Sequence, residues 1–251
     1  MAFARYSAPE PVIVNTTTCA IVLASDRDEN LGSAVCPPFL YLHNRPVLAY
    51  ALSALSASPE IDSFVVAIPK DRAETMLNLV KMFGYSKIRK IVAAPAKRSS
   101  ALLAALEHVP ETADWICLLD PSRPLVNAAL VSDTVRAAHR HGAAVAATEL
   151  LDPVVLAKRG APLARVASSA REHLWSLLSP LAATKADIRA AAASFASAKK
   201  DFPDIAALAD ALPVVPRPVP DTPAPFSFFR VRSADDLPAA VQLLRAQGTI
   251  A

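Results

Sequence analysis

An aspartate and an arginine follow an apolar run near the middle of the chain. Asp120 comes directly after Trp115–Leu119, Pro121 is next, and Arg123 stands three residues beyond the aspartate. In open parallel sheets, ligands bind outside the carboxyl ends of the strands, so a charged pair at such an end is a candidate for ligand binding. The structural alternative is that Asp120 caps a turn before the proline and that Arg123 pairs with it.

A second candidate segment follows the first apolar run and is rich in acidic residues. Asp26, Asp28 and Glu29 surround Arg27 there. Carboxylates so clustered can hold a hard cation such as Mg²⁺. The simpler interpretation is a solvated loop, because charge runs are usually surface features.

Glycines are scarce and far apart. The chain of 251 residues holds five of them, at Gly32, Gly84, Gly142, Gly160 and Gly248. A backbone cradle for phosphate needs glycine for positive φ and for close approach to the ligand. A glycine-rich dinucleotide fingerprint and a Walker-type loop are therefore excluded.

Composition narrows the class of protein further. The 26 lysines and arginines nearly balance 23 acidic residues and are scattered, which argues against a nucleic-acid surface. Three widely separated cysteines predict no disulfide framework and favour a reducing compartment. No export signal and no membrane-spanning run is apparent, so we expect a cytoplasmic protein without a membrane partner.

Strand-like and helix-like segments alternate from Cys19 to about Thr148. The predicted strands are Cys19–Ser25, Phe64–Ile68, Ile88–Ala93, Trp115–Leu119 and Ala143–Ala147. The predicted helices are Pro46–Ser58, Asp71–Phe83, Ser99–His108 and Asn127–His141. Asp71 and Asn127 are expected helix N-caps. The alternation predicts βαβ units, and hence a mainly parallel sheet that places Asp120 at a strand end.

The pattern changes after Thr148. Two β-prone stretches, Val154–Ala157 and Leu163–Ala167, predict a hairpin arm at about 149–170. Helices are then expected at the segments Thr184–Ala198, Asp204–Leu212 and Ser233–Gln247. The proline-rich segment Pro213–Pro225 is expected to be extended, as an edge strand or polyproline II. Phe226–Val231 is expected to return to the sheet.

Five segments occur in the order that they have in the 2-C-methyl-D-erythritol 4-phosphate cytidylyltransferases of the non-mevalonate isoprenoid pathway. They are Arg98–Leu106 (RSSALLAAL), Ile116–Val126 (ICLLDPSRPLV), the arm, Arg171–Pro180 (REHLWSLLSP) and Phe229–Leu237 (FRVRSADDL). The chain resembles this family from Cys19 to Leu244. The resemblance implies an α/β, Rossmann-like nucleotidyltransferase fold: one domain at 19–251 after an N-terminal extension at 1–18. Its mainly parallel sheet is flanked by helices, and the arm protrudes and joins a homodimer.

Such enzymes transfer a cytidylyl group from CTP to an acceptor phosphate with Mg²⁺ and release pyrophosphate. By resemblance, Asp120, Arg123 and Ser179 bind the acceptor, and Arg171 clamps its phosphate. Arg230 stands where the family has a lysine and keeps the charge without the lysine geometry.

The nucleotide side departs from the family pattern. Arg27 joins Arg171 and Arg230 as a candidate catalytic cation, and the resemblance assigns the nucleotide to a second set of residues, namely Ala24, Ser25 and Arg98. The loop lysine of the family aligns with Pro38, which carries no charge. A nucleotide-binding serine aligns with Ala101, and the arm threonine aligns with Pro153. Losing the lysine alone is expected to slow catalysis by about 10²–10³.

The sequence is compatible with three alternative functions. The leading prediction is a cytidylyltransferase-like protein that has lost most catalysis and binds a nucleotide, a phosphate ligand or a protein partner. The alternative is an active nucleotidyltransferase that uses Mg²⁺ with CTP or another nucleotide. A third interpretation is a scaffold that docks a partner through Val214–Pro225.

Overall fold

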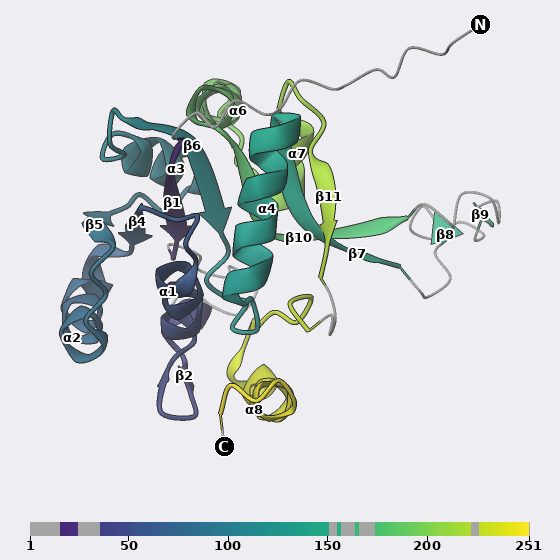
Figure 1. The fold of residues 1–251 in the computed structure, drawn as a ribbon. Coiled ribbons are helices and arrows are strands. Elements are labelled where there is room, and N and C mark those ends of the chain that lie inside the picture. Colours follow the sequence, from purple (N-terminus) through teal and green to yellow (C-terminus); the bar gives the residue numbers. More distant parts are fainter. Residues whose placement is uncertain are drawn as a thin grey trace, which may run out of the picture.

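The computed structural model describes residues 16–24, 36–150, 155–156, 164–165, 174–221 and 226–250. Its centre is a seven-stranded sheet in the order β11-β7-β10-β6-β1-β4-β5 (Figure 1). The strands are β1 (Thr17–Leu23), β4 (Ser63–Ile68), β5 (Ile88–Ala93), β6 (Ala113–Leu119), β7 (Ala143–Glu149), β10 (Trp175–Thr184) and β11 (Arg217–Pro220). Only β10 runs antiparallel to its neighbours, so the predicted mainly parallel sheet is confirmed.

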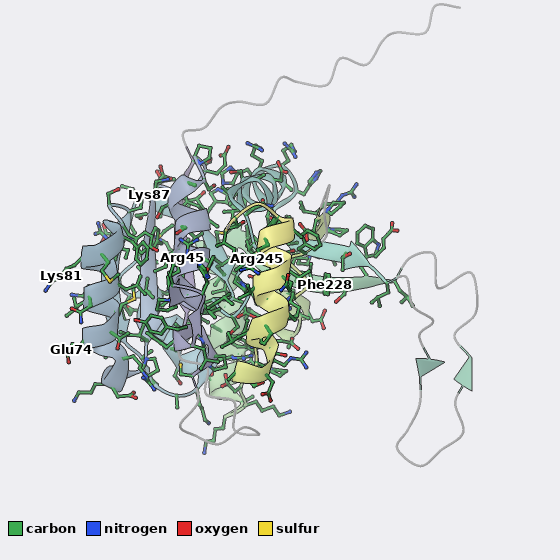
Figure 2. The ribbon with its side chains drawn as sticks, turned by 90° about the horizontal axis from the view of Figure 1, so that it is seen from below. Arg45, Glu74, Lys81, Lys87, Phe228 and Arg245 are labelled. Carbon is green, nitrogen blue, oxygen red and sulfur yellow. The ribbon has the colours of Figure 1, made fainter. Side chains whose placement is uncertain are left out.

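Helices cover both faces of this sheet. They are α1 (Val47–Ala57), α2 (Ala73–Phe83), α3 (Arg98–Leu106), α4 (Ala128–His141), α6 (Lys185–Ser197), α7 (Ile205–Asp210) and α8 (Leu237–Ala246). Short 3₁₀ turns occur at Pro37–Phe39, Lys70–Arg72 and Ala234–Asp236. In Figure 2, which views the molecule from below, α8 lies in front, α2 with Glu74 and Lys81 lies at one side, and Phe228 lies at the other.

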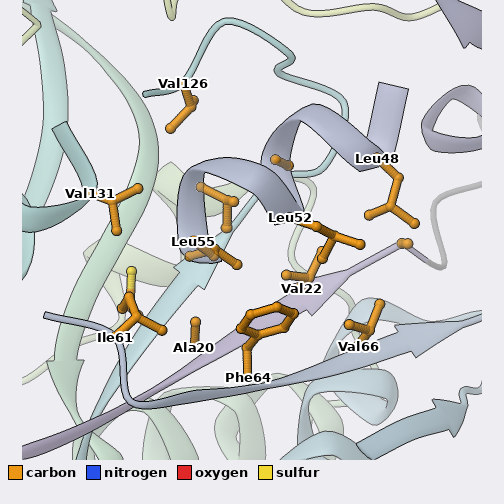
Figure 3. Packing of buried hydrophobic residues seen from close by; sticks show 14 of the residues in the cluster. Ala20, Val22, Leu48, Leu52, Leu55, Ile61, Phe64, Val66, Val126 and Val131 are labelled. Carbon is orange, nitrogen blue, oxygen red and sulfur yellow. The ribbon is translucent and has the colours of Figure 1, made fainter. Parts of the chain in front are cut away.

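The core is divided by the sheet into two layers. One layer packs α1, α2 and α4 on β1 and β4, with Phe64 and Leu52 among its fully buried side chains (Figure 3). The other layer packs α3, α6 and α7 on the opposite face, around Ile21 and Leu102. Because both faces of β1 are covered, its last five residues, Cys19–Leu23, form a continuous apolar run rather than an alternating pattern.

A third, smaller cluster lies outside the two layers and joins α8 to the rest. Leu42, Tyr50, Leu125 and Val231 pack there against Leu244. Leu42 belongs to a two-stranded hairpin of β2 (Tyr41–Leu42) and β3 (Arg45–Pro46) that precedes α1. This hairpin was not predicted from the sequence.

The structure differs from the predicted elements in three places. Phe226–Val231 does not return to the sheet, since Val231 packs in the third cluster with α8 instead. The sheet gains Trp175–Thr184, a ten-residue strand that was not predicted. Asp71 lies in a 3₁₀ turn, and Arg72 occupies the N-cap position of α2.

Other local predictions are confirmed. Asn127 caps α4, because its side chain accepts a 2.8 Å hydrogen bond from the Leu130 amide. Arg217–Pro220, within the proline-rich segment, forms the edge strand β11. In the arm, β8 (Val155–Leu156) pairs antiparallel with β9 (Ala164–Arg165), and the rest of 151–173 lies outside the described residues.

Within the described part of the chain, no helix is long and apolar enough to cross a membrane. Cys19, Cys36 and Cys117 are buried thiols and form no disulfide.

Candidate active site

A pocket of about 210 Å³ lies where β1 and β6 end and β10 begins. Its lining combines leucines from these three strands with charged side chains from other elements. The lining residues are Leu23, Leu118, Leu119, Leu177, Leu178, Phe202, Ile205, Ala206, Arg98, Asp120, Arg123, Asp204, Arg230 and Arg232. The pocket therefore occupies the carboxyl end of the parallel strands, where the sequence placed the candidate site.

Asp120 is the centre of the polar contacts in this pocket. Its amide donates a 2.8 Å hydrogen bond to Ser179 Oγ on β10, and its Oδ1 accepts one of 2.9 Å from the Ser122 amide. Its Oδ2 lies 3.3 Å from Nε of Arg230 and 3.6 Å from Nε of Arg123. The carboxylate thus caps its own turn, as the structural alternative expected, and also faces two pocket arginines.

Arg123 is anchored on the side away from Asp120. Its Nη1 donates hydrogen bonds of 3.0 and 2.7 Å to the carbonyls of Ser227 and Phe228. Ser227 is itself fixed by buried Asp221, whose Oδ2 accepts bonds from the Ser227 amide at 2.9 Å and hydroxyl at 2.7 Å. These contacts join the end of β6 to the segment that leads into Arg230.

Burial lowers the pKa of Arg123, and Asp120 opposes this effect. The positive charges of Arg230 and Arg232 lower that pKa further. An arginine pKa starts so high that the side chain remains charged at neutral pH. Three cations held this close together repel one another, and an anion between them relieves the repulsion.

The arginines on either side of Val231 enter the pocket together. Val231 is fully buried, and its amide donates a 2.9 Å hydrogen bond to the Ser122 carbonyl. Arg230 and Arg232 flank this anchored residue, and both line the pocket. Arg230 was predicted from the sequence and Arg232 was not, although the alternation of charged and apolar residues around Val231 was a usable signal.

The residues predicted to bind the nucleotide differ in where the structure places them. Arg98 lines the same pocket as Asp120, at the start of α3. The Ala24 amide donates a 2.8 Å bond to the Ala67 carbonyl, so this amide is already used in the strand pairing. Ser25 and Arg27 lie outside the described residues, as does Arg171. Pro38 is described, and it is buried in a 3₁₀ turn.

The pocket carries a surplus of positive charge. Four arginines and two aspartates line it, which leaves two positive charges. They are Arg98, Arg123, Arg230, Arg232, Asp120 and Asp204. Guanidinium groups are the preferred partners of phosphate in proteins because they offer paired donors. The arrangement suits a doubly charged phosphate more than a neutral ligand.

Comparison with known proteins identifies the family. A profile of the 2-C-methyl-D-erythritol 4-phosphate cytidylyltransferases (IspD) matches residues 18–245. The chain belongs to this family. The IspD enzyme of Pelotomaculum thermopropionicum is 29% identical over 234 residues, which cover 92% of this chain and 96% of that protein.

Other relatives match over a shorter part of their length. The bifunctional enzyme IspD/IspF of Desulfotalea psychrophila is 32% identical over 141 residues, or 56% of this chain and 36% of that enzyme. An IspD enzyme of Clostridium botulinum (strain Langeland) is 27% identical over 124 residues, which cover 49% of this chain and 54% of that enzyme. The chain thus spans about a third of the first relative and about half of the second.

A solved structure shares the fold. The 4-diphosphocytidyl-2C-methyl-D-erythritol synthase of Anaerococcus prevotii superposes with a TM-score of 0.77 at 19% identity, covering 92% of this chain and 96% of that one. This likeness confirms the α/β nucleotidyltransferase-like fold that the sequence motifs predicted.

Proposed function

We propose that this IspD-family protein binds a phosphorylated polyol, such as 2-C-methyl-D-erythritol 4-phosphate, in the arginine-lined pocket and has strongly reduced cytidylyl transfer. The observation that carries the proposal is the pair of arginines held on one carboxylate, since Arg123 and Arg230 both approach Asp120 Oδ2. This arrangement presents fixed positive charge to an anion that enters the pocket.

Reduced catalysis is proposed from the residues around the nucleotide. By family resemblance the position of the loop lysine is Pro38, which is buried and has no cationic side chain. The aligned nucleotide serine is Ala101, which is fully buried on α3. In the transfer, an acceptor phosphate oxygen attacks the α-phosphorus of CTP and pyrophosphate leaves. Each missing donor is expected to slow this step by about 10²–10³.

A resident magnesium ion does not fit the pocket's described carboxylates. Asp120 already faces the Ser122 amide and two guanidinium groups, and Asp204 caps α7 by accepting a 2.9 Å bond from the Ala207 amide. Among the residues that the structure describes, no group of three His, Cys, Asp or Glu side chains could hold a metal. We therefore propose that Mg²⁺, if used, arrives on the phosphates of the nucleotide.

Calorimetric titration tests the acceptor site. The expected result is that 2-C-methyl-D-erythritol 4-phosphate binds the wild-type protein and binds Arg230→Ala at least about tenfold more weakly. A loss of this size is expected when one hydrogen bond to a charged group is removed. Arg136→Ala is the matched control, because Arg136 pairs with Asp133 and Glu60 on the surface and does not line the pocket. Equal affinity in all three proteins would refute the assignment.

A turnover assay separates reduced catalysis from the alternative, an active nucleotidyltransferase. Arg98 and Arg232 favour that alternative, because they add two cations to the same pocket. Release of pyrophosphate from CTP with Mg²⁺ and the acceptor is compared with that of the Pelotomaculum relative. We expect a rate at least about 10² lower. A similar rate would show that the protein is an active nucleotidyltransferase and would contradict the proposal of reduced catalysis.

A homodimer joined through the arm at 149–170 is part of the proposal, as is a cytoplasmic location. The buried thiols Cys19, Cys36 and Cys117 support a reducing compartment. Light scattering of the full chain and of a variant without residues 151–173 tests the dimer. A wild-type monomer would contradict it.

A further inference from the structure

The connection between α6 and α7 makes a tight backbone turn. α6 ends at Ser197, and Lys199 has a φ of 56°, in the left-handed region that glycine normally occupies. The Lys199 and Lys200 amides close the turn by donating 3.0 Å bonds to the carbonyls of Ala196 and Phe195. A non-glycine residue persists in this conformation only where the surrounding contacts require it.

The residue that follows this turn caps a helix from far away in the sequence. Asp201 Oδ2 accepts a 2.8 Å bond from the Arg98 amide, and Oδ1 accepts one of 2.8 Å from the Ser99 amide. Lys97, at the N-cap position of α3, makes no capping bond with its side chain. Asp201 thus satisfies two amides at the positive end of the α3 dipole from about one hundred residues away.

The two segments that Asp201 joins form two walls of the pocket. Arg98 lines the pocket from the first turn of α3. Phe202 and Asp204, which follow Asp201, line it from the other segment. Oδ1 of Asp201 also accepts a 3.0 Å bond from the Phe202 amide, and the Phe202 ring is buried. Asp201 itself is exposed and does not line the pocket.

We propose that Asp201 is a positioning residue that holds the α7 wall of the pocket against α3. The carboxylate orders the α3 wall and the α7 wall and thereby keeps Arg98 and Asp204 at a fixed separation across the pocket. Its effect on ligand affinity rests on the proposed function, whereas its effect on the two walls does not.

Hydrogen exchange of the ligand-free protein tests the positioning directly. In Asp201→Ala we expect the amides of Arg98 and Ser99 and those of α7 to exchange at least about tenfold faster. The reason is that the free energy of local opening falls by about the contribution of one hydrogen bond to a charged group. Asp201→Asn keeps the shape and loses the charge, so it should show a smaller change at the same amides. It also provides the measurement if the alanine variant does not fold.

The control is Thr184→Ala, which removes another helix cap at the opposite end of the sheet. Thr184 caps α6 by accepting a 3.1 Å bond from the Asp187 amide. This variant should speed exchange at the start of α6 and leave α3 and α7 unchanged. Unchanged α7 exchange in both Asp201 variants would overturn the proposal, as would an equal change of α7 in the control.

Titration with 2-C-methyl-D-erythritol 4-phosphate then tests the consequence for binding. We expect Asp201→Ala to bind about tenfold more weakly than the wild type at a temperature where both are folded. Faster exchange with unchanged affinity would overturn the link to the ligand. If the wild type binds no acceptor, the proposed function fails, and the exchange measurement still decides whether Asp201 positions the wall.

Discussion

Replacing Arg123 by alanine is expected to destabilise the protein far more than replacing a surface arginine. The Arg123 side chain is 15% exposed and donates two hydrogen bonds from Nη1 to the carbonyls of Ser227 and Phe228. A hydrogen bond to a charged group contributes about 1.5–3 kcal/mol. Two such bonds give an upper bound of about 6 kcal/mol, and water entering the space reduces it, so we expect a loss of about 3 kcal/mol.

The matched control is Arg136→Ala. Arg136 has a side chain that is 46% exposed and pairs with Glu60 and Asp133 at 3.1 and 2.6 Å. Exposed ion pairs contribute about 0–1 kcal/mol, so this variant should lose less than about 1 kcal/mol. Arg123→Lys should lie between the two, because an ammonium keeps the charge but cannot reproduce the planar fork of the guanidinium.

Urea unfolding at neutral pH measures these differences through the midpoint and slope of the transition. A loss for Arg123→Ala no larger than that for Arg136→Ala would show that the two buried hydrogen bonds contribute no more than an exposed ion pair. Arg123 would then be a replaceable surface charge, and the two carbonyls would not need it. A large loss for Arg123→Lys equal to that for alanine would show that the charge itself contributes little beside the geometry.

Three further predictions concern separate parts of the molecule. Burial lowers the pKa of His139 below the unfolded value near 6.5, so the folded protein favours the neutral ring. Stability should therefore fall as pH drops below about 6.5, and His139→Gln should flatten this slope in urea unfolding at pH 7.5 and 5.5. Lys199→Gly should raise stability by about 1 kcal/mol, since glycine tolerates a φ of 56°; a destabilised variant would contradict this. Arg232→Ala should weaken binding of inorganic pyrophosphate by about tenfold with no change in the unfolding midpoint, and unchanged affinity would remove it from the site.

Much of the sheet could be predicted because a strand that is covered on both faces has a short, continuous apolar sequence. β1, β4 and β6 are apolar runs followed by charged or turn residues, and alternation with helices fixed their parallel direction. β10 was missed because Pro180 lies within it, and proline normally argues against an inner strand. The structure accommodates this proline where the register with β7 shifts between Leu177 and Leu181.

The segment Phe226–Val231 was misplaced for the opposite reason. Its apolar residues have the composition of a strand, but Phe226, Phe229 and Val231 pack in the third cluster with α8, and Phe228 is exposed. Apolar composition predicts that a segment is buried, but it does not predict in which hydrophobic cluster the segment packs.

The candidate site was partly predictable for similar reasons. Asp120, Arg123 and Arg230 follow or flank buried runs, and the structure brings all three together. Asp201 gave no such signal, because its partners are the backbone amides of Arg98 and Ser99, which any sequence provides. A cap that comes from a distant segment depends on the tertiary fold and is not visible in local patterns.

The position of β10 between β6 and β7 also has a consequence for how the chain folds. Among the strands that the structure describes, β7 and β11 join the others only through β10, and 25 residues separate the end of β7 from the start of β10. As the chain leaves the ribosome, β1, β4, β5 and β6 can pair while the outer edge of β6 still lacks its neighbour. β7 has no place in the sheet until the chain has been made through Thr184. The open edge of β6 is therefore exposed to pairing with other chains during that interval, and the rate of β10 insertion governs how long the interval lasts.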